Sequence, residues 1–138
     1  MSEQIVKTGM GIMIFKDGKV LFGKRKNSHG AATYAPPGGS LEFMESFEDC
    51  ARREVREETG IEIENIKFLC LSNQKIYDKH FVNLGFTADW KSGESQVMEP
   101  EKCEAWVWYD IDKLPQPLFP TVAYYLKALQ TKEYYFDA

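Results

Sequence analysis

Apolar residues recur in blocks whose lengths predict a protein built mainly of strands. Residues 6–15 are mostly apolar and predict a strand, residues 16–18 (Lys-Asp-Gly) predict a hairpin turn, and residues 20–23 return as the partner strand. Residues 61–75 alternate at first and are then densely apolar, and residues 80–90 form a further strand-like block.

The C-terminal half continues with a polar loop and closes on a helix. Residues 91–100 predict the loop, residues 105–109 an aromatic-rich strand, and residues 110–115 a short helical turn or a loop. From Thr121 onward, helical spacing links the apolar residues Val122, Tyr125, Leu126 and Leu129. The aromatic residues of this closing helix are expected in the core rather than against a bound base.

Between the strands, one amphipathic helix has well-marked ends. Ser46 followed by Asp49 is a capping pair, and Gly60 is a natural stop. The apolar stripe of this helix comprises Phe47, Cys50, Ala51 and Val55. At about 100° per residue, Glu54, Glu57 and Glu58 fall within an arc of roughly 100° that overlaps the stripe.

The position of these carboxylates favours a cation site over a solvated acidic face. A solvated face, which is the commoner fate of a charge run, should lie opposite the apolar stripe, whereas Glu54, Glu57 and Glu58 adjoin it. Carboxylates crowded at the margin of a core repel one another and lose solvation, so either their pKa values rise or a cation holds them. An all-oxygen cluster suits a hard ion, Mg²⁺ or Mn²⁺.

This helix and the segment before it carry a resemblance to a known family. The pattern Gly39-x5-Glu45-x7-Arg53-Glu54-Val55-x-Glu57-Glu58-x-Gly60-Ile61 matches every defined position of the nudix box. Fixed residues at fixed spacing over this length make the match specific. The resemblance implies hydrolysis of a nucleoside diphosphate linked to a further group, with divalent metal ions.

The order of the predicted elements and the resemblance lead to the same fold class. Strands around helices predict a mixed sheet with helices packed against it, in the α/β class. The resemblance independently implies the nudix fold, an α/β/α sandwich. With 138 residues, no internal repeat and no low-complexity tract, the chain is expected to be a single domain over 1–138.

Composition and charge limit the kinds of ligand, partner and compartment expected for this protein. The formal net charge of -4 argues against nucleic acid polymers, which are normally bound by a basic face, but not against small nucleotides. The 3 Cys residues are widely spaced and predict neither a disulfide framework nor a zinc site. No targeting segment and no membrane span are predicted, so we expect a reducing, cytoplasmic compartment.

Within the acidic cluster, Glu54 and Glu58 are the preferred metal ligands, and Glu57 completes the set. The proton of the attacking water must pass to one of these residues or to a carboxylate outside the box, and the sequence leaves that choice open. Arg53 is expected to pair with Glu45 or to hold a glutamate in position. A surface ion pair worth under about 1 kcal/mol is the alternative interpretation of the Arg53–Glu45 pair.

Two further metal contacts are implied by the resemblance alone. Gly39 is expected to offer its carbonyl to the metal, because a glycine lets a ligand approach the backbone closely. Glu101 matches the place where relatives supply a distal ligand, although Glu99 and Glu104 are equally acidic neighbours.

The basic segment Lys24-Arg25-Lys26 allows two interpretations, solvated surface charge or contact with a substrate phosphate. The phosphate contact is suggested because the loop after this segment leads directly into the turn that contains Gly38 and Gly39. His29, in the same loop, lies among small residues and is expected at the surface rather than in catalysis.

A narrower resemblance covers the chain up to about residue 126. Residues 23–26, 37–43 and 99–108 are similar to nucleoside triphosphate diphosphatases acting on oxidised or thio-substituted guanine nucleotides, and to a dihydroneopterin triphosphate and NADH pyrophosphatase. This implies a role in sanitising the nucleotide pool. The chain departs from that subgroup at Ala35-Pro36, Asn83 and Pro120-Thr121, where the base should bind, so no base preference follows.

The expected reaction converts a (deoxy)nucleoside triphosphate to monophosphate and pyrophosphate, with attack at the α or β phosphorus. Phe119, Asn83 and the turn of Tyr34, Ala35 and Pro36 are expected to wall the base pocket. The alternatives are a dinucleotide pyrophosphatase for NADH or ADP-ribose and a nucleotide-sensing module. The second is disfavoured because sensing modules typically lose box carboxylates.

A homodimer is also expected. The aromatic residues Trp90, Trp106, Trp108, Tyr124 and Tyr125 exceed what one small core needs, and the resembling enzymes are dimeric. A single core filled with aromatic side chains is the alternative.

Overall fold

The computed structural model describes residues 4–26 and 29–137. The strands are β1 (Val6–Lys16), β2 (Lys19–Arg25), β3 (Tyr34–Ala35), β4 (Gly38–Ser40), β5 (Glu62–Ile76), β6 (Lys79–Ser92), β7 (Cys103–Asp110) and β8 (Tyr135–Asp137). The helices are α1 (Phe47–Thr59) and α2 (Thr121–Thr131). Together they form an α/β fold with a mixed 8-stranded sheet.

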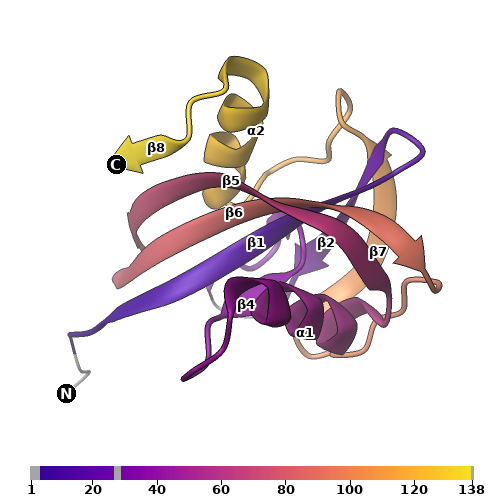
Figure 1. Ribbon diagram of the computed structural model, residues 1–138, viewed down its shortest axis with the longest axis horizontal. Helices are drawn as coiled ribbons and strands as arrows, with labels where there is room; N and C mark the ends of the chain where they lie inside the picture. The colour runs from indigo at the N-terminus through magenta and orange to yellow at the C-terminus, as the bar shows by residue number, and fades with distance from the viewer. Residues whose placement is uncertain (1–3, 27–28, 138) are drawn as a thin grey trace.

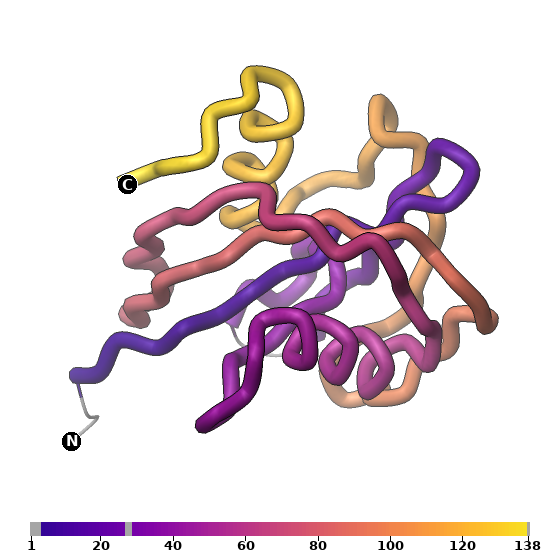
Figure 2. Tube along the Cα trace, in the orientation of Figure 1, coloured from indigo at the N-terminus to yellow at the C-terminus, as the bar shows by residue number. Residues whose placement is uncertain are grey.

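The sheet is organised around β1, which has neighbours along both edges. Its path runs β3-β2-β1-β6-β5-β8, while β4 pairs with β1 and β7 pairs with β2. The β1–β6 and β5–β8 pairs are parallel and the others antiparallel. Figure 2 shows β1, β6 and β5 running side by side between the turns of the two helices.

The helices cover opposite faces of this sheet (Figure 1). Because side chains alternate along β1, Met10, Ile12 and Ile14 join the core that contains Val55 of α1, whereas Met13 joins the core that contains Tyr125 of α2. A strand buried on both faces needs a nearly continuous apolar run, which is the pattern of β1 in the sequence.

Most predicted elements are confirmed, and three details differ. Gly38 and Gly39, expected as a turn, form strand β4 against β1. Phe47, expected in the apolar stripe of α1, is half exposed. Strand β8, too short to be predicted, adds a parallel edge to β5.

The cysteines and the two helices have the following states in the described part of the chain. Cys50, Cys70 and Cys103 are free and buried. Neither α1 nor α2, the helices in the described part of the chain, is long and apolar enough to cross a membrane.

Candidate active site

Local sequence fixes both ends of the helix that carries the acidic cluster. The Ser46 hydroxyl accepts a hydrogen bond from the Asp49 backbone N–H at 3.1 Å, which satisfies one free donor of the first turn. Gly60 ends the helix with a left-handed φ of 77°, and its N–H donates to the Arg56 carbonyl. Between these caps, the acidic face of α1 lies beside β4.

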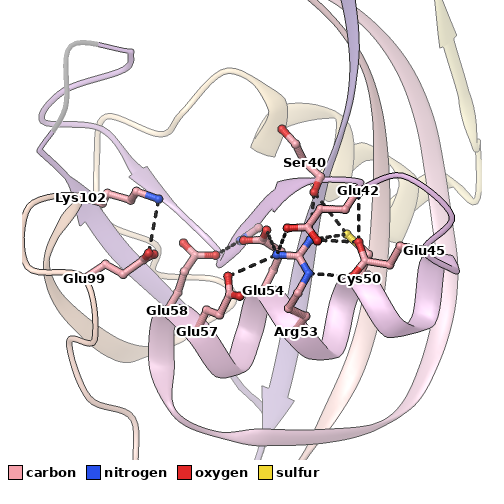
Figure 3. A network of polar contacts seen from close by, with 11 residues as sticks. Ser40, Glu42, Glu45, Cys50, Arg53, Glu54, Glu57, Glu58, Glu99 and Lys102 are labelled. Atoms are coloured by element: carbon pink, nitrogen blue, oxygen red, sulfur yellow. Dashed lines mark hydrogen bonds and ion pairs between the residues drawn. The ribbon is translucent and has the colours of Figure 1, made fainter.

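Arg53 is the cation around which the carboxylates of this face gather (Figure 3). Its guanidinium donates two hydrogen bonds to Glu45, at 2.7 and 3.0 Å, and one to Glu54 at 2.7 Å. It also contacts Glu57 at 3.3 Å and Glu42 at 3.5 Å. Arg53 therefore both pairs with Glu45 and positions Glu54, and its hydrogen bonds lower the pKa of Glu45 to about 2.

Glu58 lies at the other end of the cluster, away from the guanidinium. One of its carboxylate oxygens, Oε2, accepts a hydrogen bond from the Gly38 backbone N–H at 2.9 Å. Burial, and then the neighbouring charge of Glu54, raise the pKa of Glu58 to about 8. Burial also raises the pKa of Glu54. A nearby positive charge would lower both values.

Backbone glycines bring strand β4 within reach of these carboxylates. A Cβ on Gly39 would lie 2.2 Å from Oε2 of Glu54 and a Cβ on Gly38 would lie 2.1 Å from the Met10 carbonyl oxygen. At Gly38 the obstacle is backbone, so only glycine fits there, whereas at Gly39 the obstacle is the end of the Glu54 side chain, which a Cβ would displace. The close approach places the backbone of β4 directly beside the carboxylates of α1.

The carboxylate donors Glu54, Glu57 and Glu58 suit a hard cation in their chemistry, although they do not converge on a single point. Within residues 4–26 and 29–137, no three His, Cys, Asp or Glu side chains already form a group that could hold a metal ion. Arg53 holds Glu54 and Glu57 through the same guanidinium nitrogen, Nη1. Glu58, by contrast, is a carboxyl whose pKa is raised to about 8, and Lys102 and Arg25 act on it as nearby charges without forming a close ion pair among the described residues. Oxygen ligands with unneutralised charge are what Mg²⁺ selects.

These carboxylates open into a cavity of about 470 Å³. At one end it is lined by Gly38, Gly39, Glu54 and Glu58, and its remaining wall includes Arg25, His29, Phe81, Asn83 and Phe119. This volume lies within the range of small-molecule sites. One cavity thus joins an anionic end to an aromatic end.

The aromatic end is built by the loop after β2 together with Phe119. The His29 ring lies 5.5 Å from the Phe119 ring, in an edge-to-face arrangement, and 5.8 Å from Phe81. The Arg25 guanidinium lies 4.4 Å from the centre of the Phe119 ring and donates through Nε to the His29 carbonyl. Burial lowers the pKa of both Arg25 and His29.

Many of the residues expected at the site come together in this cavity. Those that line it are Arg25, Ala35, Gly38, Gly39, Glu54, Glu58, Asn83 and Phe119. Glu45, Arg53 and Glu57 form the ion-pair network beside it.

Three of the expected site residues, Lys24, Tyr34 and Glu101, do not line the cavity. Lys24 pairs instead with Glu104 at 3.6 Å, because alternation along β2 turns it away from Gly23 and Arg25, which line the cavity. The Tyr34 ring packs on Tyr109, edge to face, rather than in the cavity. Glu101 is exposed, and the acid whose charge acts on both Glu54 and Glu58 is Glu99.

Figure 3 shows Glu99 and its partner Lys102 beyond Glu58, on the loop that faces the helix. The Lys102 ammonium lies 3.4 Å from Glu99. Sequence alone gave no basis for preferring Glu99 over Glu101, because both belong to one acidic loop.

Two cavity residues were missed from the sequence. His29 was expected at the surface, but its ring is partly buried in the cavity wall, and its Nδ1 finds no hydrogen-bond partner within residues 4–26 and 29–137. Gln74 was not predicted as a site residue, because a polar residue at an alternating strand position is normally solvated. It is in fact 2% exposed and lines the cavity.

Comparison with known families and structures agrees with this arrangement. The NUDIX domain family matches residues 7–129 of the chain. This chain is similar to the crystal structure of a MutT NUDIX hydrolase from Burkholderia pseudomallei, with a TM-score of 0.83 and 34% sequence identity. The match covers 89% of this chain and 97% of that one.

Two similar curated proteins are described by different activities. An oxidized purine nucleoside triphosphate hydrolase of Danio rerio is 34% identical over 113 residues, which cover 75% of this chain and 66% of that protein. An NAD-capped RNA hydrolase, NudC, of Pseudomonas putida is 32% identical over 122 residues, which cover 88% of this chain. The chain spans 43% of the length of that second relative.

Proposed function

The chain belongs to the NUDIX family of hydrolases acting on pyrophosphate bonds, and from this premise we propose that it converts (deoxy)nucleoside triphosphates to monophosphate and pyrophosphate. Its substrates would include oxidised or modified purine nucleotides, as in sanitation of the nucleotide pool. The observation that carries the proposal is the single cavity in which the Glu54–Glu58 end adjoins an aromatic end of base-binding character.

Mg²⁺ or Mn²⁺ would be held by Glu54 and Glu58, completed by Glu57 and the Gly39 carbonyl. When bound, such an ion neutralises phosphate charge and makes an attacking water more acidic. Glu99 replaces Glu101 in this proposal as the distal acid, because its charge acts on both Glu54 and Glu58.

The chain's own residues then have separable roles. Arg53 fixes Glu54 by a 2.7 Å hydrogen bond, so that this carboxylate presents one orientation to the cavity. The backbone N–H of Gly38 does the same for Glu58. The proton released from the attacking water passes to Glu57 or Glu99, whose carboxylates flank the buried pair and remain in contact with solvent.

At the aromatic end of the cavity, the substrate base would stack against Phe119, and Arg25 would contact the sugar or a phosphate of the substrate. Arg25 is suited to this because its guanidinium is already ordered by Phe119 and by the His29 carbonyl. Ordering before binding reduces the entropy lost when the substrate is positioned.

A second candidate function is hydrolysis of dinucleotides such as NADH or ADP-ribose. Similarity to the NAD-capped RNA hydrolase over 88% of this chain supports it. The two reactions differ in products, since a dinucleotide yields two monophosphates and no pyrophosphate. A sensing module without catalysis is disfavoured because every carboxylate of the nudix box is present.

The deciding experiment supplies GTP, dGTP, an oxidised dGTP, NADH and ADP-ribose with Mg²⁺ and identifies the products chromatographically. We expect monophosphate and pyrophosphate from the triphosphates, and loss of turnover when the metal is removed with a chelator. Orthophosphate with a diphosphate product, or cleavage of NADH alone, would overturn the proposal.

We also propose a homodimer in a reducing, cytoplasmic compartment. The dimer is supported by exposed aromatic side chains at Phe68, Tyr134 and Tyr135. The compartment is supported by the free, buried state of Cys50, Cys70 and Cys103.

A further inference from the structure

The loop between β6 and β7 is fixed to the C-terminal end of α1 by hydrogen bonds. The Met98 backbone N–H donates to the Glu58 carbonyl at 3.3 Å, and the Trp106 indole N–H donates to the same carbonyl at 3.0 Å. The Gln96 backbone N–H donates to the Thr59 carbonyl at 2.8 Å. The last carbonyls of a helix have no partner within the helix, so these bonds hold the loop against the residue that carries the buried carboxyl.

Lys102 lies at the end of this loop and lines the cavity. Its backbone N–H donates to the Glu99 carbonyl at 2.9 Å, and its own carbonyl accepts from the Lys26 N–H at 3.0 Å. Its ammonium lies 3.4 Å from the Glu99 carboxylate, and Figure 3 shows this pair beside Glu58. The Lys102 charge lowers the pKa of Glu58, against the larger opposing effects of burial and Glu54. The backbone of Lys102 is therefore fixed, and its charge acts at the anionic end of the cavity.

The ion pair of Lys102 is weaker than the contacts of the other cations near the cavity. Arg53 contacts four carboxylates, and the Arg25 guanidinium packs 4.4 Å from the centre of the Phe119 ring. The side chain of Lys102 is 55% exposed, and its partner Glu99 lies only three residues away in the sequence. Exposed ion pairs of this kind add little to stability, so Lys102 can change partner at little cost.

We propose that Lys102 binds a phosphate of the substrate by leaving Glu99, and that this exchange releases the Glu99 carboxylate to the metal ion. The inference rests on the proposed function and adds a substrate-binding residue to it. A phosphate chain carries several negative charges, so it offers the ammonium stronger charge-assisted hydrogen bonds than one exposed carboxylate does. A carboxylate that has lost its ammonium partner is in turn a better ligand for a hard cation. Substrate binding and completion of the metal site are coupled in this arrangement.

The test uses two substitutions of Lys102 and one matched control. Lys102→Met keeps most of the side-chain length and removes the charge, whereas Lys102→Arg keeps the charge. The control is Lys113→Met, at the opposite end of β7 and outside the cavity lining. The Lys113 backbone N–H donates to the Asp110 carbonyl at 2.9 Å, so this lysine also lies three residues after an acidic residue in a hydrogen-bonded turn.

The first measurement is phosphate binding by calorimetry, with magnesium pyrophosphate titrated into the protein at the same Mg²⁺ concentration. We expect Lys102→Met to weaken binding by about tenfold or more, the effect of one lost hydrogen bond between charged groups. Lys102→Arg and Lys113→Met should stay within about threefold of the unmodified protein, because the first keeps the charge and the second lies elsewhere. In the proposed reaction, kcat/KM for the triphosphate should follow the same order.

The second measurement is Mn²⁺ binding to the substrate-free protein by electron paramagnetic resonance. Lys102→Met should tighten Mn²⁺ binding by about threefold or more, because Glu99 is released from its ion pair. In a Glu99→Gln background, the same substitution should have a much smaller effect, so the two substitutions form a double-mutant cycle. Equal tightening in both backgrounds would show that Lys102 acts as a general positive charge and not by holding Glu99.

The outcomes separate this inference from the proposed function. Pyrophosphate binding that Lys102→Met leaves unchanged, or that Lys102→Arg and Lys113→Met weaken equally, overturns the inference even if triphosphates are hydrolysed. Mn²⁺ tightening that does not depend on Glu99 also overturns it. Absence of triphosphate hydrolysis, with Lys102-dependent pyrophosphate binding and Glu99-dependent Mn²⁺ tightening, supports the inference and overturns the proposed reaction.

Discussion

Arg53 and Glu58 mark the two electrostatic ends of the acidic cluster. The single guanidinium of Arg53 contacts Glu42, Glu45, Glu54 and Glu57, and none of these contacts exceeds 3.5 Å. Glu58 is outside this set: within the described residues it accepts a hydrogen bond from the Gly38 backbone N–H, and Lys102 and Arg25 act on it only as nearby charges. The protein therefore pairs one end of the cluster with its own guanidinium, and the proposed metal ion would neutralise the other end.

Glu58→Gln should lower Mg²⁺-dependent turnover by about a thousandfold or more, because it removes a formal charge from the proposed metal site. The fold should survive, since the substitution removes a carboxyl whose charged form is disfavoured by burial and by Glu54. Steady-state kinetics and thermal unfolding measure the two effects. Glu64→Gln, at an exposed position of β5, is the control. Near-normal activity of Glu58→Gln would contradict the metal assignment.

The Arg53–Glu45 pair gives a pH prediction with a definite sign. The pKa of Glu45 falls from an ordinary value near 4.5 to about 2 in the folded protein, mainly through its hydrogen bond to Arg53. The stabilisation of the folded protein by the Arg53–Glu45 pair is therefore fully present above pH 4.5 and is lost as pH falls toward 2. Glu45→Gln should lower the free energy of unfolding at pH 7, and the difference from the unmodified protein should shrink between pH 4.5 and 2.

Urea unfolding at pH 7 and pH 2.5 measures this difference. Glu94→Gln, on the exposed loop after β6, should give no such pH-dependent change. A destabilisation by Glu45→Gln of the same size at both pH values would show that the pair does not act through the Glu45 charge.

At this scale, the sequence predicted the residues of the motif and some cavity residues outside it, such as Asn83 and Phe119, but it did not reveal His29 or Gln74. The Arg53–Glu45 pair follows from the spacing of the box and is present at 2.7 Å. His29 and Gln74 could not be found, because their burial depends on contacts between segments distant in sequence. His29 packs on Phe119, for example, and Gln74 pairs with Phe81.

At the scale of elements, the approach of β4 to both α1 and β1 determines the shape of the anionic end of the cavity. The two glycines of β4 serve different neighbours. Gly38 lies against the backbone of β1, and Gly39 lies against the Glu54 carboxylate. A side chain at each position should therefore have a different effect.

Gly38→Ala should destabilise the protein, because its Cβ would lie 2.1 Å from the Met10 carbonyl oxygen and β4 could not stay paired with β1. Gly39→Ala meets only the end of the Glu54 side chain, so it should keep the stability and lose most of the activity as that carboxylate is displaced. Thermal unfolding and kinetics on both variants form a matched comparison. Equal Tm losses in the two variants would contradict this division.

Elements with strong local sequence signals were predictable, whereas the short strands β4 and β8, which exist through pairing with a neighbouring strand, were not. Helix α1 begins and ends where Ser46 and Gly60 predict, since caps are local interactions. Strand β4 was expected as a turn because Pro-Pro-Gly-Gly carries no strand pattern, and its strand character comes from hydrogen-bonded pairing with β1. Strand β8 likewise exists through its pairing with β5.

At the scale of the whole molecule, the aromatic residues have a different distribution from the one that the sequence suggested. Trp90, Trp106 and Trp108 pack against the core beside α1, and Tyr125 is fully buried in the core beside α2. The surplus of aromatic residues that suggested a dimer is thus largely absorbed within one chain. Composition could not reveal this, because it does not say which face of a strand a residue occupies.

The proposed homodimer would therefore use a different surface, formed by Phe68, Leu71, Tyr134 and Tyr135. Phe68 is 53% exposed, and Tyr134 and Tyr135 are 64% and 65% exposed. Together with Glu133 they surround a shallow depression along β5 and β8. Exposed apolar patches of this kind mark interfaces more often than isolated apolar side chains do.

We expect light scattering at micromolar concentration to give about twice the 15.9 kDa mass of one chain. Replacing both Phe68 and Tyr135 by Ser should shift the mass to that of the monomer, because a dimer interface loses affinity when its central apolar side chains are removed. Phe43→Ser is the control, since Phe43 is 95% exposed on the loop before α1, outside this patch. A monomer mass for the unmodified chain would rule out the dimer. A dimer that persists in the double variant would place the interface on another surface.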